Sequence, residues 1–250
     1  MDLAVQRSVV ANLRQRPRVL EVGPFVLGYD PTTDSRFINY ATPRPDATVS
    51  AADVTDLVAA FGEIRRVPRL EYVVSSSPHL EEQLLAAGFT VEARHDYLVC
   101  SPQTLSVPPT PDGVQVDVPA DDEEVRMLVS AQNEAFGGPP SASDADVARV
   151  RRTQSLGGVV MLARNDHGVI AGGQSSPPSA GLVEVAGIAV RAAFRGHGIG
   201  GTLTAAITER ALASGVEAAW LEASGSDSWR VYERVGYRPR GKRLYISLEQ

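Results

Sequence analysis

The sequence predicts an α/β fold with a mixed sheet, and three observations lead to this prediction. A mostly apolar segment at 181–190 is followed by a glycine-rich turn at 195–201, and an amphipathic helical pattern then extends to Ala211. A second apolar segment, 219–224, precedes a helical pattern that ends at Gly236. Strand-like and helix-like segments also alternate ahead of both, which is typical of strands that are connected by helices.

The turn Arg195-Gly196-His197-Gly198-Ile199-Gly200-Gly201 has the layout of an anion-binding site. Glycine has no Cβ, so the main chain can come close to a ligand, and the unpaired N–H groups of the first helical turn then point at it. A P-loop would need a lysine after its last glycine, whereas Thr202-Leu203 follow here. A dinucleotide-binding turn would come at the first strand of the fold, and this turn comes late. Phosphate is the expected ligand of this turn, and triphosphate hydrolysis and dinucleotide binding are disfavoured.

At these residues the sequence resembles the GNAT superfamily of N-acetyltransferases. Arg195, Gly198 and Gly200 fit the acetyl-CoA motif of the family, and 230–237 (Arg-Val-Tyr-Glu-Arg-Val-Gly-Tyr) is similar to its helix that carries a tyrosine and ends in Gly-Phe or Gly-Tyr. The resemblance covers about 114–248. It implies the acetyl-CoA N-acyltransferase fold and the transfer of an acetyl group to a primary amine of a small molecule or to a free amino group, by direct transfer in a ternary complex.

The second half of the chain supplies the other elements that such a domain needs. Acidic residues at 121–123 mark a helix start, and the glycines and prolines at 137–141 end that helix. By resemblance, this loop and the helix after it wall the acceptor site. In chain order we expect a strand at 114–118, helices at 121–136 and about 145–154, and strands at 159–164, 169–174 and 182–190.

A weak internal repeat relates the first half to the second. Gly88-Phe89 corresponds to Gly236-Tyr237, and Tyr97 corresponds to Tyr245 at the same offset. The alternative is that any helix that ends in glycine and an aromatic residue before a strand would look alike. Under the repeat, 47–53 aligns with the glycine turn and contains no glycine, so each Cβ there would obstruct a pyrophosphate.

These observations predict three segments. Residues 1–103 form a degenerate GNAT-like domain without a coenzyme-binding turn, which supports its neighbour. This half begins with strand-like segments at 19–22, 25–29 and 37–41, so we expect it to lack the leading strand and helices of a full domain. Residues 104–113 form an extended, semi-rigid proline-rich linker, and 114–250 form the acetyltransferase domain.

Acyl transfer to an amine requires a polarised carbonyl, a protonated leaving thiolate and a base for the acceptor. The resemblance assigns the first task to the main-chain N–H groups of Ile188 and Val190, and the second to Tyr232. A phenol with an ordinary pKa near 10 can donate a proton to a thiolate whose pKa is near 8.5 by analogy with cysteine. The alternative for Tyr232 is a core tyrosine whose hydroxyl bonds to the backbone.

The base is the least determined group. Glu184 lies on the strand before the turn, where a half-buried carboxylate would have a raised pKa, and the alternative is a solvent-facing strand position. Asn133, Glu134 and Phe136 are candidates for the acceptor side, with an ordinary exposed helix end as the alternative. The coenzyme-binding residues that the resemblance implies are Ile188, Val190, Arg195, Gly196, His197, Gly198, Ile199, Gly200 and Gly201. Of these, Arg195 would hold the pyrophosphate, and His197 would tolerate the loop rather than catalyse.

Composition limits the other functions. The chain has 250 residues with a formal net charge of −6, which argues against binding through nucleic-acid phosphates. Its four histidines are scattered, so no metal site is expected, and Cys100, the only cysteine, is expected to be a small core residue. No apolar run or signal segment points to a membrane, so the cytoplasm is expected. The oligomeric state stays open, and the rival function is a noncatalytic acetyl-CoA-binding sensory or interaction protein.

Overall fold

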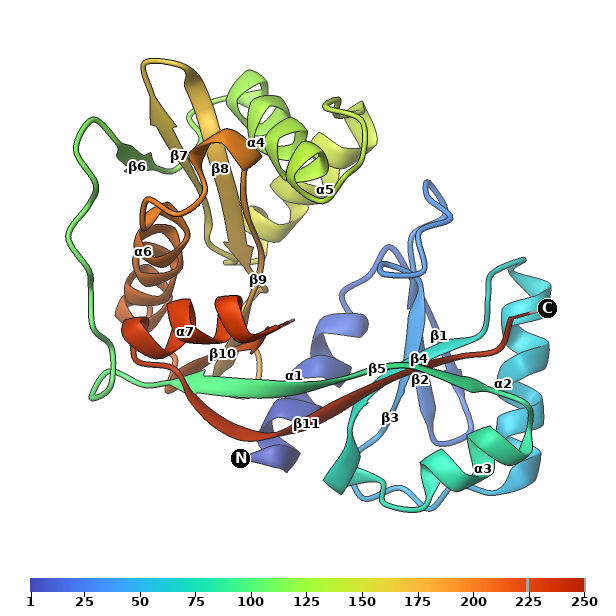
Figure 1. The fold of residues 1–250 in the computed structure, drawn as a ribbon. Coiled ribbons are helices and arrows are strands. Elements are labelled where there is room, and N and C mark those ends of the chain that lie inside the picture. Colours follow the sequence, from blue (N-terminus) through green and yellow to red (C-terminus); the bar gives the residue numbers. More distant parts are fainter. Residues whose placement is uncertain (224, 250) are drawn as a thin grey trace. The chain divides into compact units, whose positions relative to one another are not determined.

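The structure of the chain, a computed structural model, describes residues 1–223 and 225–249 (Figure 1). It divides into two compact units: unit 1 is Met1–Tyr97 together with Arg240–Gln250, and unit 2 is Leu98–Pro239. Both units are mixed α/β, which confirms the expected fold class. Their limits differ from the expected segments 1–103, 104–113 and 114–250, because 240–250 completes unit 1 and 98–113 belongs to unit 2.

Unit 1 is a mixed sheet covered on both faces. Within it the strand order is β1-β2-β3-β4-β11-β5, antiparallel at β1–β2, β2–β3 and β4–β11 and parallel at β3–β4. Phe25 and Leu27 pack on the face of α2 with Leu57, whereas Val26 packs with Leu13 of α1 on the opposite face. The elements are α1 (Asp2–Leu13), β1 (Arg18–Val22), β2 (Phe25–Tyr29), β3 (Tyr40–Pro43), α2 (Ala51–Glu63), β4 (Arg69–Val73), the short turn η1 (Val74–Ser76), α3 (Leu80–Ala86), β5 (Thr90–Cys100) and β11 (Arg238–Ser247).

Helix α1 corrects the expectation that the first half begins with strands. Val5, Val9 and Leu13 form a buried apolar stripe along it. Gln6 lies beside this stripe and is also fully buried. Its burial is tolerated because its side-chain amide donates to Thr42 Oγ1 at 2.8 Å and its side-chain carbonyl accepts the N–H of Val73 at 2.9 Å. A polar residue that is satisfied by the neighbouring strands therefore hides the amphipathic pattern of the helix.

Strand β11 pairs with β4, and a buried charged cluster lies at this pairing. The two features explain why 240–250 belongs to unit 1. Arg243 lies opposite Val73 and Ser247 lies opposite Arg69. Arg69 and Arg243 are each only 1% exposed, and both approach the buried carboxylate of Glu71, Arg243 at 3.3 Å. A buried charge needs a partner, so these side chains hold β11 in register on β4.

Unit 2 is a second mixed sheet with helices on both faces (Figure 1). From β10 the strand order is β10-β9-β8-β7-β6, with the end of β5 beside β10; β9 and β10 are parallel, and β6 to β9 are antiparallel neighbours. Helices α6 and α7 cover the face of Val183 and Val185, and α4 and α5 cover the face of Leu162. The elements are β6 (Gln115–Asp117), α4 (Asp122–Ala135), α5 (Asp144–Ser155), β7 (Val160–Asn165), β8 (Gly168–Ser175), β9 (Leu182–Val190), the short turn η2 (Ala192–Phe194), α6 (Ile199–Ala213), β10 (Ala218–Ala223) and α7 (Ser226–Val235).

From β1 in unit 1 and from β7 in unit 2, helices and strands follow in the same order, and from α2 and α6 onward they keep the offset seen in the sequence. Helix α2 begins at Ala51 and α6 begins at Ile199, and α3 and α7 are each followed by a left-handed glycine, Gly88 with φ 89° and Gly236 with φ 103°. The start of α2 is chemically different from that of α6. Ser50 caps it, and the carboxylate of Asp53 accepts the N–H of Ser50 at 2.8 Å.

The proline-rich segment packs against the rest of unit 2. Ser106 donates its N–H to the carbonyl of Val235 at 2.9 Å. A Cβ on Gly236 would lie 1.8 Å from the carbonyl oxygen of Thr104, so this close approach requires glycine. Pro111 lies 3.9 Å from where a Cβ on Gly198 would be, at the start of α6.

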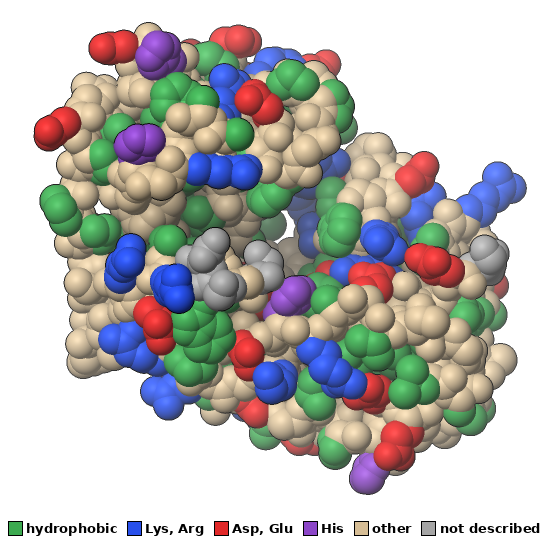
Figure 2. Space-filling model, viewed as in Figure 1, with side chains coloured by type: hydrophobic (Ala, Val, Ile, Leu, Met, Phe, Trp, Pro, Cys, Tyr) green, Lys and Arg blue, Asp and Glu red, His purple; other side chains and the backbone are tan. Residues whose placement is uncertain are grey.

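On the face drawn in Figure 2, acidic and basic side chains are interspersed and do not form one basic patch. Among the described residues, no helix combines the length and apolar character needed to cross a bilayer. The same residues contain no group of three or more His, Cys, Asp or Glu side chains arranged to hold a metal ion.

Candidate active site

The site is built where strand β9 leaves its neighbour β10. The parallel pairing runs from Leu182 opposite Ala218 to Glu184 opposite Trp220. Strand β9 nevertheless continues to Val190, six residues beyond the last paired position. Along this stretch the backbone edge that faced β10 is open for other hydrogen-bond partners.

A β-bulge redirects the free part of β9. Its pairing with β8 changes register between Ala186 and Ala189, around Gly187, which has a φ of 65°. The side-chain amide of Gln132 on α4 donates to the carbonyl of Gly187 at 2.7 Å, and a Cβ on Gly187 would lie 2.9 Å from the same nitrogen. Gly187 is required here for both its conformation and this contact, so helix α4 holds the bulge in place.

Two N–H groups lie on the free edge of β9. The N–H of Arg191 donates to the carbonyl of Ile170 on β8 at 2.9 Å. Because successive N–H groups of a strand alternate in direction, those of Val190 and Ile188 face away from β8. Their side chains pack toward α6 in the core of unit 2. The two donors therefore point to the side that β10 has left.

The glycine turn follows directly and opens helix α6. Gly196 and Gly198 have φ values of 84° and 81°, the left-handed region that favours glycine, and Gly198 caps the helix. Gly200 has no such requirement, because a Cβ there would meet only Val190 Cγ2 at an ordinary 3.7 Å. The main-chain N–H groups of the first helical turn have no acceptor within the helix, and they are available to an anion.

Arg195 braces the turn in the structure. Its Nε donates to the carbonyl of Val190 at 3.0 Å, and its Nη2 donates to the carbonyl of Ala135, at the end of α4, at 2.8 Å. These bonds connect the end of β9, the turn and the negative end of the α4 dipole. His197 is exposed, and its Nδ1 lies 3.3 Å from the carbonyl oxygen of Phe194.

The three acceptor-side candidates have different surroundings. Asn133 donates its side-chain N–H to the carbonyl of Ser141 at 2.7 Å, so it organises the loop after α4. Glu134 pairs with Arg191 at 3.3 Å. Phe136 is 68% exposed at the end of α4, which leaves its ring free to contact another molecule.

Glu184 is half-buried at the last paired position of β9. Its N–H donates to Ser176 Oγ at 2.9 Å, and its carbonyl accepts the N–H of Ser176 at 2.7 Å. Val183 and Val185 face α6, so the side chain of Glu184 belongs to the opposite face of the sheet.

Tyr232 lies on α7 and packs against the core on the α6 face, so the structure places it and Glu184 on opposite faces of the sheet. Its ring meets Tyr237 edge-on, with centroids 6.3 Å apart, and burial raises the pKa of its phenol. The adjacent Val231 lies 3.6 Å from where a Cβ on Gly201 would be. Helix α7 therefore packs against the first turn of α6, beside the glycine turn.

Gln132 and Gly187 are the site residues that sequence reasoning missed. A glycine inside a strand pattern is a signal of a bulge, and Gly187 carries that signal. Its partner could not be identified from the sequence, because Gln132 comes from α4 through a contact that only the fold creates.

Comparisons with known proteins agree with this geometry. The model of the acetyltransferase (GNAT) family matches residues 125–237. A GCN5-related N-acetyltransferase from Kribbella flavida is similar with a TM-score of 0.83 and 24% identity, over 100% of this chain and 96% of its own. One from Sphaerobacter thermophilus has a TM-score of 0.68 and 17% identity, with 99% and 92% covered. A tandem GNAT protein from the clavulanic acid biosynthesis pathway has a TM-score of 0.62 and 14% identity, with 84% and 76% covered.

A comparison with curated proteins gave no match. The structural likenesses lie below 25% identity, so they show the fold. The matched segment contains α4, the bulged strand β9, the glycine turn and α7. Fold and family model both agree with the resemblance seen in the sequence: residues 125–237 match the acetyltransferase (GNAT) family, and the chain has the fold of GCN5-related N-acetyltransferases.

Proposed function

We propose that this chain is an N-acetyltransferase that uses acetyl-CoA to acetylate a primary amine of a small molecule or a free amino group, by direct transfer within a ternary complex. The observation that carries the proposal is that β9 leaves β10 after Glu184 and leads straight into the glycine turn. The free N–H groups of the strand and those of the first turn of α6 thus follow one another along the chain. Such a run of donors suits a thioester followed by a pyrophosphate.

The residues of the turn fit a pyrophosphate. Gly196 and Gly198, in the left-handed conformation, expose the main chain to a ligand. At Gly200 the packing would accept a methyl group, so the missing Cβ leaves room for a ligand. We assign pyrophosphate contacts to the main chain of Gly196, His197, Gly198, Ile199, Gly200 and Gly201. Arg195 adds positive charge and, through its bonds to Val190 and Ala135, fixes the turn. Bound there, acetyl-CoA supplies the acetyl group as a thioester.

The N–H groups of Ile188 and Val190 are the proposed donors to the thioester carbonyl oxygen. Fixed backbone donors stabilise charge that grows on such an oxygen, and they need no rearrangement during the reaction. The bulge held by Gln132 sets their direction. Gln132 is therefore a positioning residue.

Tyr232 is the proposed proton donor to the departing thiolate. Burial raises the pKa of its phenol, so the hydroxyl keeps its proton at neutral pH. A thiol with a pKa near 8.5 is a stronger acid than a phenol with an ordinary pKa near 10, so proton transfer from Tyr232 to the thiolate is uphill and needs close positioning. Packing on Tyr237 supports that positioning.

Glu184 is the proposed base for the acceptor amine, acting directly or through water. On the acceptor side, exposed Phe136 would contact the substrate. Asn133 and Glu134 would shape that side through the loop and through Arg191, because both already have these partners.

Unit 1 is proposed to bind no acetyl-CoA. Ser50 and Asp53 already cap the start of α2, and the carboxylate of Asp53 would repel a phosphate there. We therefore assign it the role of a degenerate domain that supports unit 2.

The test is the release of CoA thiol from acetyl-CoA in the presence of a panel of primary amines, with secondary alcohols as controls. We expect release that depends on at least one amine and is absent with the alcohols. If acetyl-CoA binds in calorimetry but no amine releases thiol above the rate with water, the chain is a noncatalytic acetyl-CoA-binding protein and the proposal fails.

A further inference from the structure

Unit 2 contains a buried pair of hydroxyl groups to which the proposed reaction assigns no task. Thr208, on α6, and Tyr237, just after α7, are both fully buried, and their hydroxyl oxygens lie 2.6 Å apart. The hydroxyl of Thr208 donates to the carbonyl of Thr204 at 2.7 Å. Because a hydroxyl has a single hydrogen, Tyr237 is the donor to Thr208. The pair therefore has a fixed direction, from Tyr237 through Thr208 to the backbone of α6.

Helix α7 and the residue after it meet α6 at two places. Near the glycine turn, Val231 and Val235 lie 3.6 and 4.0 Å from where a Cβ on Gly201 would be. About two turns further along α6, Tyr237 is bonded to Thr208. The first contact is apolar and has no preferred direction, whereas a hydrogen bond weakens steeply when its angle changes. Of the two contacts, the hydroxyl pair is the one that restricts how far α7 can slide or rotate on α6.

The position of Tyr232 depends on how α7 is held. Burial alone raises the pKa of its phenol, with no hydrogen bond or charge of the described residues contributing. The place of this hydroxyl is therefore set by the ring and the backbone. The carbonyl of Tyr232 accepts the N–H of Tyr237 at 3.0 Å, and the two rings meet edge-on. Tyr237 thus contacts Tyr232 through backbone and ring while its own hydroxyl is bonded to α6.

Unit 1 indicates that the fold itself does not need such a pair. At the offset of the internal repeat, three residues of unit 1 stand where unit 2 has the hydroxyl pair and the tyrosine of α7. They are Ala60 for Thr208, Phe89 for Tyr237 and Leu84 for Tyr232. All three belong to the apolar core of unit 1. The unit that lacks a glycine turn therefore lacks both hydroxyls and the tyrosine, and it keeps the helices.

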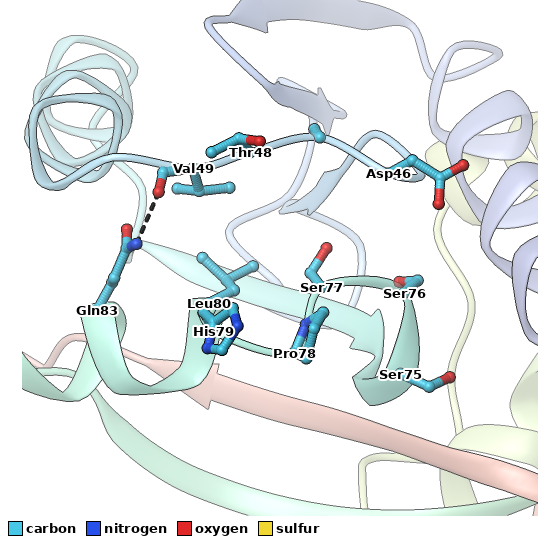
Figure 3. A pocket seen from close by; sticks show the side chains of 11 residues that line it. Asp46, Thr48, Val49, Ser75, Ser76, Ser77, Pro78, His79, Leu80 and Gln83 are labelled. Carbon is cyan, nitrogen blue, oxygen red and sulfur yellow. Dashed lines mark hydrogen bonds between the residues drawn. The ribbon is translucent and has the colours of Figure 1, made fainter.

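The two units also anchor the corresponding helices, α3 and α7, on different sides. In unit 1, Gln83 on α3 donates its side-chain N–H to the carbonyl of Val49, ahead of α2, at 2.6 Å (Figure 3). The counterpart of Gln83 in unit 2 is Val231, which has no side-chain donor. In unit 2 such a bond would reach into the glycine turn, since the counterpart of Val49 is His197. Unit 2 instead anchors α7 through Tyr237, away from the turn.

We propose that the hydroxyl pair of Thr208 and Tyr237 positions Tyr232. The pair holds α7 on the helix whose first turn is proposed to bind the pyrophosphate, so it sets the place of the Tyr232 hydroxyl relative to the bound thioester. Thr208 and Tyr237 are positioning residues, because they act through Tyr232 and not on the reacting atoms. The inference rests on the proposed acetyl transfer for the proton that Tyr232 gives, whereas the holding of its ring can be measured separately.

The first experiment measures the steady-state release of CoA thiol by the full-length protein, with acetyl-CoA and the most active amine of the panel. Tyr237→Phe and Thr208→Val should each lower kcat by about tenfold, less than the roughly 10²-fold that a misplacement of about 1 Å can cost. The KM for acetyl-CoA should stay unchanged, because the glycine turn is untouched. Thr208→Ser keeps the hydroxyl and should restore most of the wild-type kcat. Wild-type kcat in both Tyr237→Phe and Thr208→Val would overturn the proposal.

Tyr97→Phe is the matched control for the loss of a buried tyrosine hydroxyl. Tyr97 is also fully buried, and its hydroxyl donates to the carboxylate of Asp2 in unit 1. Tyr97→Phe and Tyr237→Phe should both lower the melting temperature, because each removes a buried hydrogen bond. Only Tyr237→Phe should lower kcat. An equal fall of kcat in the two variants would show a general effect of stability and would refute the positioning role.

The second experiment repeats Tyr237→Phe in a Tyr232→Phe background. If the pair acts through Tyr232, kcat should not fall further there, because no phenol is left to be positioned. The double variant Tyr237→Phe/Thr208→Val should likewise be no slower than either single variant, because both changes break one bond. A pair with a structural role alone would slow the protein by the same factor with and without Tyr232, and that result would overturn the proposal.

The third experiment needs no turnover, so it separates a failure of this inference from a failure of the proposed acetyl transfer. In protein labelled with ¹³Cζ-tyrosine, the NMR signal of Tyr232 is assigned by its loss in Tyr232→Phe. It should move in Thr208→Val, because the hydroxyl of Thr208 is linked to Tyr232 through Tyr237, and it should stay in place in Tyr97→Phe. A wild type that releases no thiol with any amine refutes the acetyl transfer. A Tyr232 signal that does not move in Thr208→Val refutes the positioning of Tyr232, whatever the activity.

Discussion

We expect Gly200→Ala to stabilise helix α6 and, at the same time, to weaken acetyl-CoA binding. Gly200 is the second residue of the helix, and its Cβ would make only an ordinary 3.7 Å contact with Val190. Alanine within a helix is favoured over glycine by up to about 1 kcal/mol, so the free energy of unfolding should rise by about 0.5–1 kcal/mol. Gly198 is a poorer test, because its φ of 81° would strain any side chain.

The loss of affinity follows from the same methyl group. If pyrophosphate oxygens approach the N–H groups of this turn, the methyl group displaces them and weakens one charge-assisted hydrogen bond. Such a bond contributes about 1.5–3 kcal/mol, which corresponds to a rise in Kd of roughly 10- to 100-fold. Stability and affinity thus change in opposite directions, which misfolding cannot produce.

Isothermal calorimetry with acetyl-CoA and chemical denaturation on the same samples measure both effects. Gly62→Ala is the matched control, since Gly62 also lies in a helix, α2, and a Cβ there would meet nothing within 4 Å. It should bring a similar gain in stability without a change in Kd. If Gly200→Ala and the larger Gly200→Val both bind acetyl-CoA as the wild type does, the assignment of the turn is wrong.

Three further predictions address catalysis, stoichiometry and the buried cluster. Tyr232→Phe should lower turnover on the order of 10²-fold with little change in acetyl-CoA affinity. Because burial raises the pKa of Tyr232, the activity that the wild type loses when this phenol ionises should be lost only above the ordinary tyrosine pKa near 10. Full turnover by Tyr232→Phe in steady-state assays would remove Tyr232 from the mechanism. Calorimetry should give one acetyl-CoA per chain, and a value of two would contradict the degenerate reading of unit 1. Arg243→Met should destabilise unit 1 by about 3–5 kcal/mol in denaturation, because it leaves Glu71 buried with one partner fewer. Its control, Lys242→Met, breaks an exposed pair with Asp96 and should cost less than about 1 kcal/mol; equal losses would refute the argument.

Local chemistry made much of unit 2 predictable from the sequence. The expected helix at 121–136 is found as α4 (Asp122–Ala135), and the one at about 145–154 is found as α5 (Asp144–Ser155). Gly198 ends up left-handed at the start of α6, as a glycine before an amphipathic pattern suggests. These features depend on neighbours along the chain, which the sequence displays directly.

Features that depend on distant partners were not predictable. Gln6 looks like a surface residue until β3 and β4 supply its partners, so helix α1 was missed. Arg195 has the charge of a phosphate ligand, but its geometry includes the carbonyl of Ala135, which comes from another helix. Likewise, nothing near Arg243 in the sequence indicates that its strand belongs with β4.

The pairing of β11 with β4 also sets an order for biosynthesis. Residues 69–73 are translated early, whereas their partners 243–247 are translated after the whole of unit 2. Until then the nascent first unit has β4 with one edge unpaired and Arg69 and Glu71 without Arg243. Strand edges of this kind are prone to pair with other chains, so this interval is when a chaperone or a slow ribosome would matter most. A ribosome-bound chain stalled before residue 243 should accordingly leave the first unit open to protease.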